Sequence, residues 1–358
     1  MYVKYLKLKN YRNYDELYIE LNSKVNVFIG DNAQGKTNIL ESIYFCSVGK
    51  SHRTNKDKEL ISWDQKEARM SVHVAKERLD KRIDISIFRE GKKSMSINSI
   101  KVNRVSDLIG TLNVVMFSPE DLKIVKESPT HRRRFMDIEL CKLNKKYYYN
   151  LVQYNKVLDE RNSALKKWRQ MNNDILDIYD EQISGYGSYI ISERQKFIDK
   201  LNEKGSKIHN DITSGNEDIH FEYLTCGAEG IQKRLRESRQ KDFERKTTST
   251  GPHRDDFDIR INGVDTRSFG SQGQQRTSVL TIKFATIDII KEMTGEYPVL
   301  LLDDVLSELD INRQKYILNS INSIQTIITC TGISDLKEYL DDGAAIYTVS
   351  SGIVKKSE

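Results

Sequence analysis

The chain has 358 residues, of which 30% are charged and 38% hydrophobic, and 57 Lys and Arg residues against 52 Asp and Glu residues give a formal net charge of +5. This length allows two compact domains or one large domain with an insertion. No apolar run approaches the length of a membrane span, which excludes an integral membrane protein. The first residues alternate like a strand and lack a signal peptide's apolar block, so we expect a cytoplasmic protein. The small basic excess permits a nucleic-acid partner without establishing one.

The N-terminal segment predicts two strands followed by a phosphate-binding loop. Residues 2–9 and 16–21 read as strands. A short apolar run over 25–29 leads into residues 30–37, which fit the P-loop pattern G-x-x-x-x-G-K-[ST]. A helical pattern follows and stops near Gly49. A strand, a glycine-bounded turn and a helix N-terminus direct backbone N–H groups and the helix dipole at one point, where an anion is stabilised.

The residues of this loop have distinct expected roles in binding ATP. Lys36 would reach the β- and γ-phosphates, and the Thr37 hydroxyl would hold Mg²⁺. The alternative, a chance glycine turn before a helix, does not account for lysine, threonine, strand and helix in register. The predicted nucleotide-binding residues here are Gly30, Asp31, Asn32, Ala33, Gln34, Gly35, Lys36 and Thr37.

The next segment is predicted to be mainly β-structure. Residues 50–54, Lys-Ser-His-Arg-Thr, are polar and basic, and they could line the nucleotide site, face DNA or form a solvated loop. Residues 69–103 alternate as strands, and 112–117 is a buried strand. Residues 118–121 have the composition of a helix start, with serine at the N-cap and proline at the first helical position.

A long proline-free segment predicts a helical arm. Residues 130–251 contain no proline, so nothing there prevents long helices. One helix is predicted from 128 towards 168 and a second over about 174–204, with Gly185 and Gly187 weakening its middle. Two long amphipathic helices joined by a polar turn predict an antiparallel hairpin.

The C-terminal part returns to strand and helix patterns. We predict a small strand over 219–223, a charged helix over 232–246, a strand over 257–261 before an Asn-Gly turn, a helix over 274–293, a buried strand over 299–303, a helix over 312–321 and a buried strand over 326–329. The fold is therefore predicted to be split, with an α/β head from both ends of the chain, residues 1–127 and 247–358, and an inserted arm lobe, residues 128–246.

Two adjacent carboxylates follow the apolar strand over 299–303. Asp303 fits the Walker B pattern, where a carboxylate at a strand end assists Mg²⁺, so Thr37 and Asp303 are the predicted metal ligands. Asp304 would orient the attacking water. Many strands end in aspartate, and this pattern gains weight only beside the P-loop.

Residues 271–275, Ser-Gln-Gly-Gln-Gln, precede a predicted helix and resemble the LSGGQ signature of ABC-type ATPases. The Ser271 hydroxyl, the N–H of Gly273 and the helix N-terminus would form a second anion-binding corner. In such ATPases this corner covers the γ-phosphate in the partner's P-loop, so we expect ATP to join two copies into a homodimer. The alternative for Ser271 is an ordinary helix N-cap. The fold class is thus α/β, an ABC-type P-loop ATPase head, split, with an inserted α-helical arm lobe, and the predicted catalytic residues are Lys36, Ser271 and Asp304.

Several motifs together resemble the RecF family, bacterial recombination mediators related to SMC-type ATPases. They are Asn10-Tyr-Arg-Asn-Tyr14, Gly30 to Asn38, Lys50-Ser-His-Arg-Thr54, Ser128-Pro-x-x-Arg-Arg-Arg-Phe-x-Asp137, Gly251-Pro-His-Arg-Asp-Asp256, Ser271 to Arg276 and Leu302-Asp-Asp-Val-x-Ser-Glu-Leu-Asp310. The resemblance implies a head-plus-arm protein that dimerises on ATP, binds single- and double-stranded DNA and hydrolyses ATP slowly. It also implies action with RecO and RecR at single-strand gaps, in replication-fork repair and in the SOS response.

Two departures from the wider ABC pattern suit slow hydrolysis. Residues 329–331, Thr-Cys-Thr, stand where transporters have a switch histidine, and Asp304 replaces the usual glutamate. We find no Q-loop glutamine and expect its equivalent in 117–120. An ATPase subunit of an ABC transporter and an ATP-gated scaffold with incidental hydrolysis are the alternative functions.

The candidate DNA contacts are arginines. Arg132 and Arg133, on the first arm helix, and Arg53 could neutralise phosphates. The alternative is internal pairing, because adjacent arginines on a helix point in different directions and at least one would meet acids within the protein.

Overall fold

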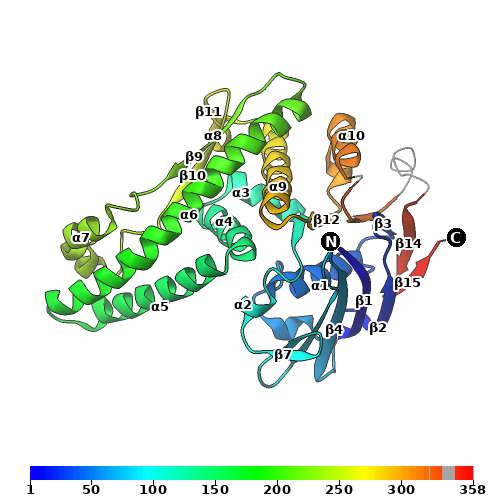
Figure 1. Ribbon diagram of the computed structural model, residues 1–358, viewed down its shortest axis with the longest axis horizontal. Helices are drawn as coiled ribbons and strands as arrows, with labels where there is room; N and C mark the ends of the chain where they lie inside the picture. The colour runs from blue at the N-terminus through cyan, green and yellow to red at the C-terminus, as the bar shows by residue number, and fades with distance from the viewer. Residues whose placement is uncertain (322, 333–342, 358) are drawn as a thin grey trace. The chain divides into compact units, whose positions relative to one another are not determined.

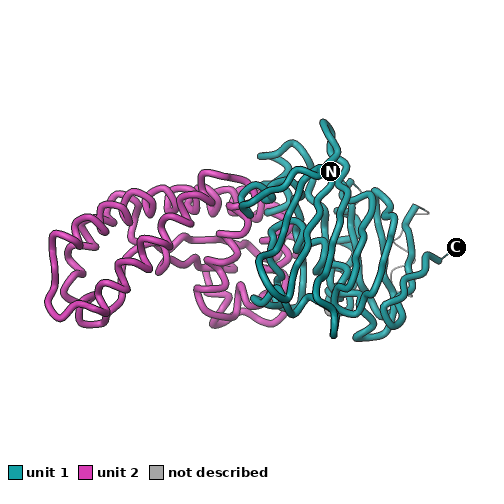
Figure 2. The backbone as a smooth tube through the Cα atoms, turned by 90° about the horizontal axis from the view of Figure 1, so that it is seen from below, with its two compact units in different colours: residues 1–121, 286–358 teal, residues 122–285 magenta. Residues whose placement is uncertain are grey.

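The computed structural model describes residues 1–321, 323–332 and 343–357 and divides the chain into two compact units (Figure 1, Figure 2). Unit 1 comprises Met1–Asp121 and Thr286–Glu358, and unit 2 comprises Leu122–Ala285. Unit 1 is therefore built from both ends of the chain. Residues 247–285, which we predicted to belong to the head, are part of the compact unit 2.

One layer of unit 1 is an antiparallel sheet with the strand order β2-β1-β4-β5-β6-β7. Its strands are β1 (Tyr2–Tyr11), β2 (Tyr14–Glu20), β4 (Glu67–Ala75), β5 (Lys81–Phe88), β6 (Ser94–Ile97) and β7 (Ile100–Val102). Alternate residues face the core, as Ile83, Ile85 and Ile87 do in β5. The strands predicted at both positions before the P-loop and over 69–103 are confirmed.

A second sheet of unit 1 carries the P-loop strand and has the order β15-β14-β3-β13-β12-β8. Its strands are β3 (Val25–Ile29), β8 (Val114–Phe117), β12 (Val299–Asp303), β13 (Thr326–Cys330), β14 (Ala345–Ser350) and β15 (Ile353–Lys356). Strand β3 pairs in parallel with β13 on one side and β14 on the other. All five residues of β12 are buried, which explains its continuous apolar run.

Helix α1 (Lys36–Val48) contacts strands of both sheets. It is therefore buried on nearly all sides, and even Glu41 is fully buried. Gly49 ends the helix in a left-handed conformation with φ 71°, as its sequence position predicts. The other short helices of this unit are η1 (Asp57–Leu60), α2 (Val105–Leu108), η3 (Leu306–Glu308) and α10 (Ile311–Ser320).

Unit 2 contains a helical hairpin and a small antiparallel sheet (Figure 1). Its helices are α3 (Lys123–Lys126), α4 (Pro129–Leu143), α5 (Lys145–Lys167), α6 (Asn173–Thr213), α7 (Ile231–Arg245) and α8 (Thr266–Phe269). Helices α5 and α6 pack on each other, which confirms the predicted hairpin. The sheet has the order β11-β10-β9, from β9 (Ile219–Leu224), β10 (Asp256–Ile261) and β11 (Val264–Asp265). Helix η2 (Pro119–Leu122) and helix α9 (Gln272–Thr294) contain residues of both units.

The prediction of one helix from 128 to 168 is wrong. Asn144 lies between α4 and α5 with extended backbone, φ −138° and ψ 102°. Its side chain accepts hydrogen bonds from the N–H groups of Lys146 and Tyr147 at 2.9 and 3.0 Å. The first backbone N–H groups of a helix have no partner within the helix, and the Asn144 side chain accepts from two of them. Asn144 therefore begins α5 as a separate helix and does not continue α4.

Helix α6 continues unbroken to Thr213, beyond the predicted end near residue 204. Gly187 does not interrupt it, because the missing side chain allows close packing: a Cβ there would lie 3.1 Å from Ile231 Cδ1. At residues 118–121 the predicted helix start is only the short η2, and the Ser118 N–H donates to the Asp121 carboxylate at 2.7 Å.

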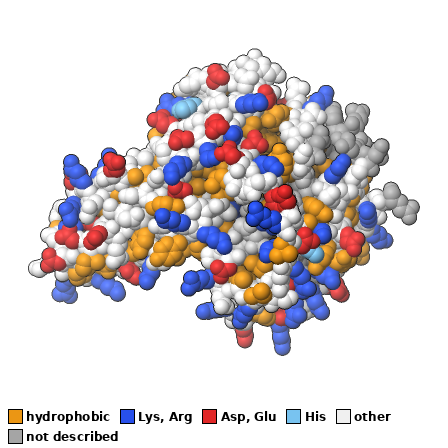
Figure 3. Space-filling model, viewed as in Figure 1, with side chains coloured by type: hydrophobic (Ala, Val, Ile, Leu, Met, Phe, Trp, Pro, Cys, Tyr) orange, Lys and Arg blue, Asp and Glu red, His pale blue; other side chains and the backbone are white. Residues whose placement is uncertain are grey.

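Charged side chains of both signs are spread over the face shown in Figure 3. Among the described residues, no helix is both long and apolar enough to cross a bilayer.

Candidate nucleotide site

The P-loop connects β3 to α1 as the sequence predicts. Gly35 is the residue before the helix and has φ 115°, a conformation that glycine adopts without the steric cost of a side chain. Ala33 is also left-handed, with φ 64°. Lys36 is 3% exposed, and its Nζ donates to the carbonyls of Gly30 and Asp31 at 2.6 and 3.0 Å. The ammonium is thus held over the loop, where phosphate oxygens would be its stronger acceptors.

The loop meets the predicted Walker B aspartate directly. The Thr37 hydroxyl donates to Asp303 Oδ1 at 2.9 Å. Burial raises the pKa of Asp303, and the hydrogen bonds from Thr37 and Thr329 oppose that shift. A hydroxyl and a carboxylate side by side are hard oxygen donors of the kind that Mg²⁺ takes together with substrate phosphates. Among the described residues, no group of three or more His, Cys, Asp or Glu side chains is arranged to hold a metal ion.

Thr329 supports both acidic residues. Its hydroxyl donates to Asp303 Oδ1 at 3.0 Å and accepts from the N–H of Asp304 at 3.0 Å. Asp304 has φ 52°, a left-handed conformation that is uncommon for residues other than glycine. Thr329 belongs to the segment 329–331, where transporters have a switch histidine. In this chain its hydroxyl binds both Asp303 and Asp304.

Two turns that are distant from the P-loop in sequence, β1–β2 and β14–β15, contact it in the structure. Asn13 Nδ2 donates to the carbonyl of Gln34 at 2.9 Å, and the Tyr14 hydroxyl donates to the carbonyl of Gly35 at 3.0 Å. From the β14–β15 turn, the N–H of Gly352 donates to the Gln34 carbonyl at 3.2 Å. Asn13 and Tyr14 belong to one of the motifs that resemble the RecF family, but the sequence alone does not predict that they contact the P-loop.

Glu41 is a buried carboxylate that joins three motifs. It accepts from Arg12 Nε and Nη2 at 2.9 and 2.8 Å and from the Ser51 hydroxyl at 2.5 Å. Burial alone would raise the pKa of Glu41, but these hydrogen bonds and the charges of Arg12 and Arg53 lower it. The carboxylate therefore stays ionised in the core and ties α1 to the β1–β2 turn and to residues 50–54.

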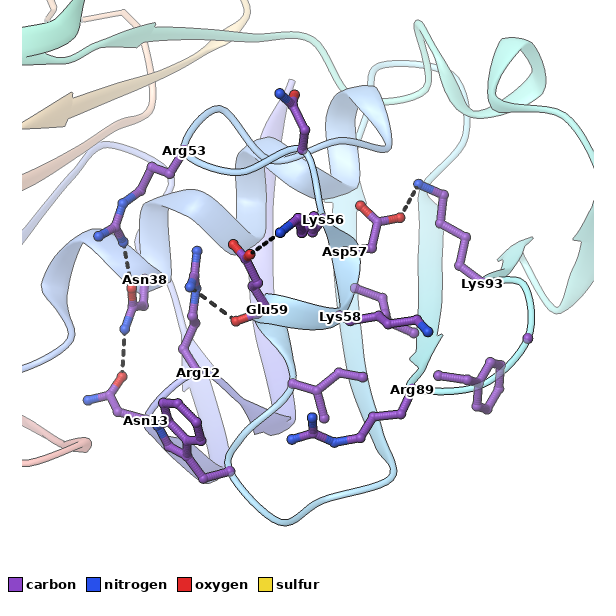
Figure 4. Close-up of a pocket in the computed structure, with 16 residues that line it drawn as sticks. Arg12, Asn13, Asn38, Arg53, Lys56, Asp57, Lys58, Glu59, Arg89 and Lys93 are labelled. Carbon is purple, nitrogen blue, oxygen red and sulfur yellow. Dashed lines mark hydrogen bonds and ion pairs between the residues drawn. The ribbon is translucent and has the colours of Figure 1, made fainter.

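A pocket of about 950 Å³ adjoins this cluster (Figure 4). Arg53 Nη1 donates to Asn38 Oδ1 at 2.9 Å, and Asn38 Nδ2 donates to Asn13 Oδ1 at 2.7 Å, so these side chains form a row at one end of it. The basic lining residues are Arg12, Arg53, Lys56, Lys58, Arg89 and Lys93. Of residues 50–54, Arg53 lines this basic pocket beside the P-loop, a placement that the sequence alone left open.

The predicted signature corner lies in unit 2. Ser271 is exposed, and its hydroxyl accepts from the N–H of Gln274 at 3.1 Å while its own N–H donates to Gln274 Oε1 at 2.9 Å. This reciprocal pair is a capping box at the start of α9. The helix-cap alternative therefore describes the local structure, in which Ser271 remains exposed. Gly273 follows within the first turn of α9.

The candidate DNA arginines differ in environment. Arg132 is 3% exposed, donates to both Asp256 oxygens at 2.6 and 2.8 Å and also binds two backbone carbonyls. Arg133 donates to the Asp255 carbonyl and to Thr130. Burial, and then the charge of Arg194, lowers the pKa of Arg133. Arg53 is exposed. The internal alternative thus applies to Arg132, because the side chain is buried and all three guanidinium nitrogens already donate to acceptors within the protein.

The split α/β fold, with a P-loop on β3 and a Walker B aspartate on β12 of the same sheet, defines an ABC-type P-loop ATPase head. The family model described as RecF/RecN/SMC N terminal domain matches residues 2–355. The DNA replication and repair protein RecF of Clostridium novyi (strain NT) is 65% identical over 362 residues, which cover 99% of this chain and 100% of that protein. The chain therefore belongs to the RecF family of DNA replication and repair proteins.

Other comparisons agree with this assignment. RecF of Clostridium kluyveri is 61% identical over 363 residues, covering 99% of this chain and 100% of that protein. A solved structure described as the recombination mediator protein RecF-ATP in the RecFOR pathway aligns with a TM-score of 0.93 and 38% identity, over 100% of this chain and 98% of that chain. The Smc head domain of Pyrococcus furiosus, at 16% identity and a TM-score of 0.59 over 99% of this chain and 96% of that chain, shares the fold. The family assignment removes the transporter alternative.

Proposed function

We propose that this chain binds ATP with Mg²⁺ at the P-loop of unit 1 and uses it to control binding to DNA. The observation that carries the proposal is the 2.9 Å contact of Thr37 with Asp303, beside the inward-held Lys36. A relative of 38% identity whose solved structure is described as RecF-ATP supports it. Mg²⁺, when bound, would neutralise phosphate charge. Thr37 and Asp303 would hold it, and Lys36 would bind the β- and γ-phosphates.

The pocket beside the loop is our proposed place for an anionic group, a phosphate of the nucleotide or of DNA. It adjoins the P-loop through Asn13 and Asn38, and its basic lining suits an anionic ligand. Arg53 lines the same pocket, so it would meet either the nucleotide or a DNA phosphate.

ATP hydrolysis in this proposal is slow and stimulated by DNA. Asp304 would orient the attacking water as a general base. Ser271 and the N-terminus of α9 would complete the site from a second copy of the chain, so that ATP joins two copies and hydrolysis separates them. The functional division we propose is a head of residues 1–127 and 247–358, which includes Ser271, and an arm of residues 128–246.

DNA is the proposed substrate, at gaps and at junctions of single and double strands, and RecO and RecR are the proposed partners. Family membership supports this assignment, and one solved relative is described as part of the RecFOR pathway. The expected setting is the bacterial cytoplasm, in gap repair, replication-fork maintenance and SOS induction. Arg53, with a secondary contribution from Arg133, remains a proposed phosphate contact, whereas Arg132 is better assigned to the fold.

Sedimentation of the full chain with ATP, with ADP and without nucleotide tests the proposal. We expect dimers only with ATP and Mg²⁺, and we expect Lys36→Ala to abolish them by removing the phosphate-binding ammonium. Lys24→Ala, which removes an exposed lysine before β3, should dimerise normally. Self-association that is independent of nucleotide would contradict the two-copy site.

A further inference from the structure

A chain of polar contacts leads from the signature turn into the interior of unit 2. Gln274, which caps Ser271 through its Oε1 atom, uses its Nε2 atom to donate to Glu217 Oε1 at 3.0 Å. Glu217 lies between α6 and β9. The same carboxylate therefore fixes the amide orientation that Gln274 needs in order to accept from the Ser271 N–H.

Glu217 also faces the end of the arm helix α6. Its Oε2 atom lies 3.3 Å from Nε2 of His209, a fully buried residue of α6; this is an ion-pair distance when the histidine is protonated, and its geometry is not that of a hydrogen bond. His209 Nδ1 lies 2.9 Å from the Thr281 hydroxyl of α9. The link thus begins on α9 at residue 274 and returns to α9 two turns later, passing through α6.

Close packing keeps this link short. A Cβ at Gly205 of α6 would lie 3.1 Å from Phe221 of β9 and 3.3 Å from Thr281, so only glycine fits there without displacement. One turn earlier, Asn202 donates to the Phe221 carbonyl and accepts from the Phe221 N–H, at 2.7 and 2.8 Å. The last turns of α6, strand β9 and the first turns of α9 therefore form one packed body.

We propose that Glu217 and His209 are positioning residues that lock the Ser271–Gln275 turn to the C-terminal end of α6. They do not touch the nucleotide. Glu217 fixes the orientation of the Gln274 amide, and this amide fixes the position of Ser271 through the helix cap. A displacement of α6 would therefore move Ser271 through these contacts. The inference rests on the proposed function of Ser271 in covering ATP bound to a second copy, and it assigns the arm helix as the regulator of that corner.

The direct test is amide hydrogen exchange of residues 271–275 in the full chain without nucleotide, comparing wild type with Glu217→Ala and Glu217→Gln. A hydrogen bond to a charged group is worth enough to change an opening equilibrium by about tenfold. We expect exchange about tenfold faster in Glu217→Ala. Glu217→Gln should be intermediate, because its amide oxygen still accepts from Gln274 while the charge facing His209 is lost.

Glu222→Ala is the matched control, since Glu222 is an exposed acid on β9, 3.8 Å from Arg260. It should exchange like wild type. Thermal unfolding of all variants separates a change confined to residues 271–275 from a general loss of stability. Unchanged exchange at 271–275 in Glu217→Ala overturns the positioning role, whether or not the wild type dimerises.

A second readout connects the link to function. In Glu217→Ala the ATP affinity of the dilute monomer should be unchanged, because the P-loop lies in unit 1, whereas the protein concentration for half-maximal ATP-dependent association should rise about tenfold. Equal weakening of both quantities would mean general damage and would reject the inference. A wild type that never associates would instead reject the proposed function and leave the exchange result to decide the link.

Discussion

Arg132 and Arg134 lie two residues apart on α4 and have opposite environments. Arg132 is buried and donates to both oxygens of Asp256, while Arg134 is exposed. A bidentate pair that is also bonded to backbone carbonyls is strong in geometry, but its main energetic consequence appears when one partner is removed.

We therefore predict that Arg132→Ala lowers the free energy of unfolding by about 3 kcal/mol, because Asp256 is left without its counter-charge. Arg134→Ala should change it by less than about 0.5 kcal/mol, as is usual at a surface position. Urea denaturation followed by circular dichroism measures both. Equal stability of the two variants would show that the buried pair is dispensable.

His253 makes unit 2 sensitive to acid. Burial lowers the pKa of His253 to about 4, and its ring lies 2.5 Å from the Tyr154 hydroxyl through Nδ1 and 3.0 Å from the Thr248 carbonyl through Nε2. A neutral ring, with Nε2–H donating to Thr248 and Nδ1 accepting from Tyr154, satisfies both contacts. Protonation would place a second donor opposite the tyrosine.

Because the unfolded histidine titrates near 6.5 and the folded one near 4, the unfolded state binds more protons in between, so stability falls as the pH drops from 6.5 towards 4. From pH 7.5 to pH 5 this group should cost about 2 kcal/mol. His253→Gln should lose that part of the pH dependence, as measured by denaturation at both pH values. The same slope in both proteins would assign the acid sensitivity to other groups.

At the scale of elements, the β14–β15 turn packs against the P-loop. Gly352 has φ 77°, and a Cβ there would lie 2.4 Å from the carbonyl oxygen of Asn13. Since Asn13 and Gly352 both bind the Gln34 carbonyl, displacing the turn would disturb the P-loop from two sides.

Gly352→Ala should therefore weaken ATP binding roughly tenfold, the equivalent of about 1.4 kcal/mol. Gly263→Ala is its control, with φ 79° and no atom within 4 Å of the added Cβ. Both variants carry a similar backbone strain, on the order of 1 kcal/mol, but only Gly352→Ala should alter nucleotide titrations. Equal ATP affinity in both would exclude the turn from the site.

Features that depend on residues close together in the sequence were predicted well, and features that depend on contacts between distant segments were not. The strand–loop–helix unit at 25–48 is set by local pattern, and most elements were predicted within a few residues of their bounds. The break at Asn144 was missed because an asparagine is compatible with either a helix interior or a cap. Glu41 gave no sign of being buried, since its partners Arg12 and Ser51 come from other segments of the chain.

The site residues that belong to known sequence motifs were predicted, whereas the residues that join the site only through tertiary contacts were not. The structure brings Lys36, Thr37, Asp303 and Asp304 to one place, as Walker A and B motifs imply. The cover by Gly352 joins segments about 300 residues apart, and the bridge by Thr329 joins β13 to the end of β12, 26 residues earlier in the chain; no spacing rule reveals either contact. The candidate Arg132 shows the converse error, since charge alone does not indicate exposure.

At the scale of the whole molecule, ATP turnover should set how long the protein stays on DNA. We predict that Asp304→Asn keeps ATP binding and ATP-dependent association but lowers kcat by about 10²–10⁴, the usual effect of removing a general base. Its complexes with gapped DNA should then dissociate more slowly than those of the wild type. Lys36→Arg, which alters the phosphate contact itself, should lose association as well.

Single-molecule dwell times on gapped DNA, measured with excess ATP, check this prediction. If Asp304→Asn leaves DNA as quickly as wild type and restores gap repair in cells, hydrolysis is incidental and the scaffold alternative holds.

The position of β3 between β13 and β14 also determines when the nucleotide site can exist during synthesis. Both neighbours of β3 are encoded about 300 residues after it. At about 5–20 residues per second, the ribosome needs roughly 15–60 seconds to supply them. Unit 2 is continuous in sequence and emerges in full during that interval. The P-loop strand thus waits without either partner on the nascent chain, and ATP binding would report that translation has passed residue 350.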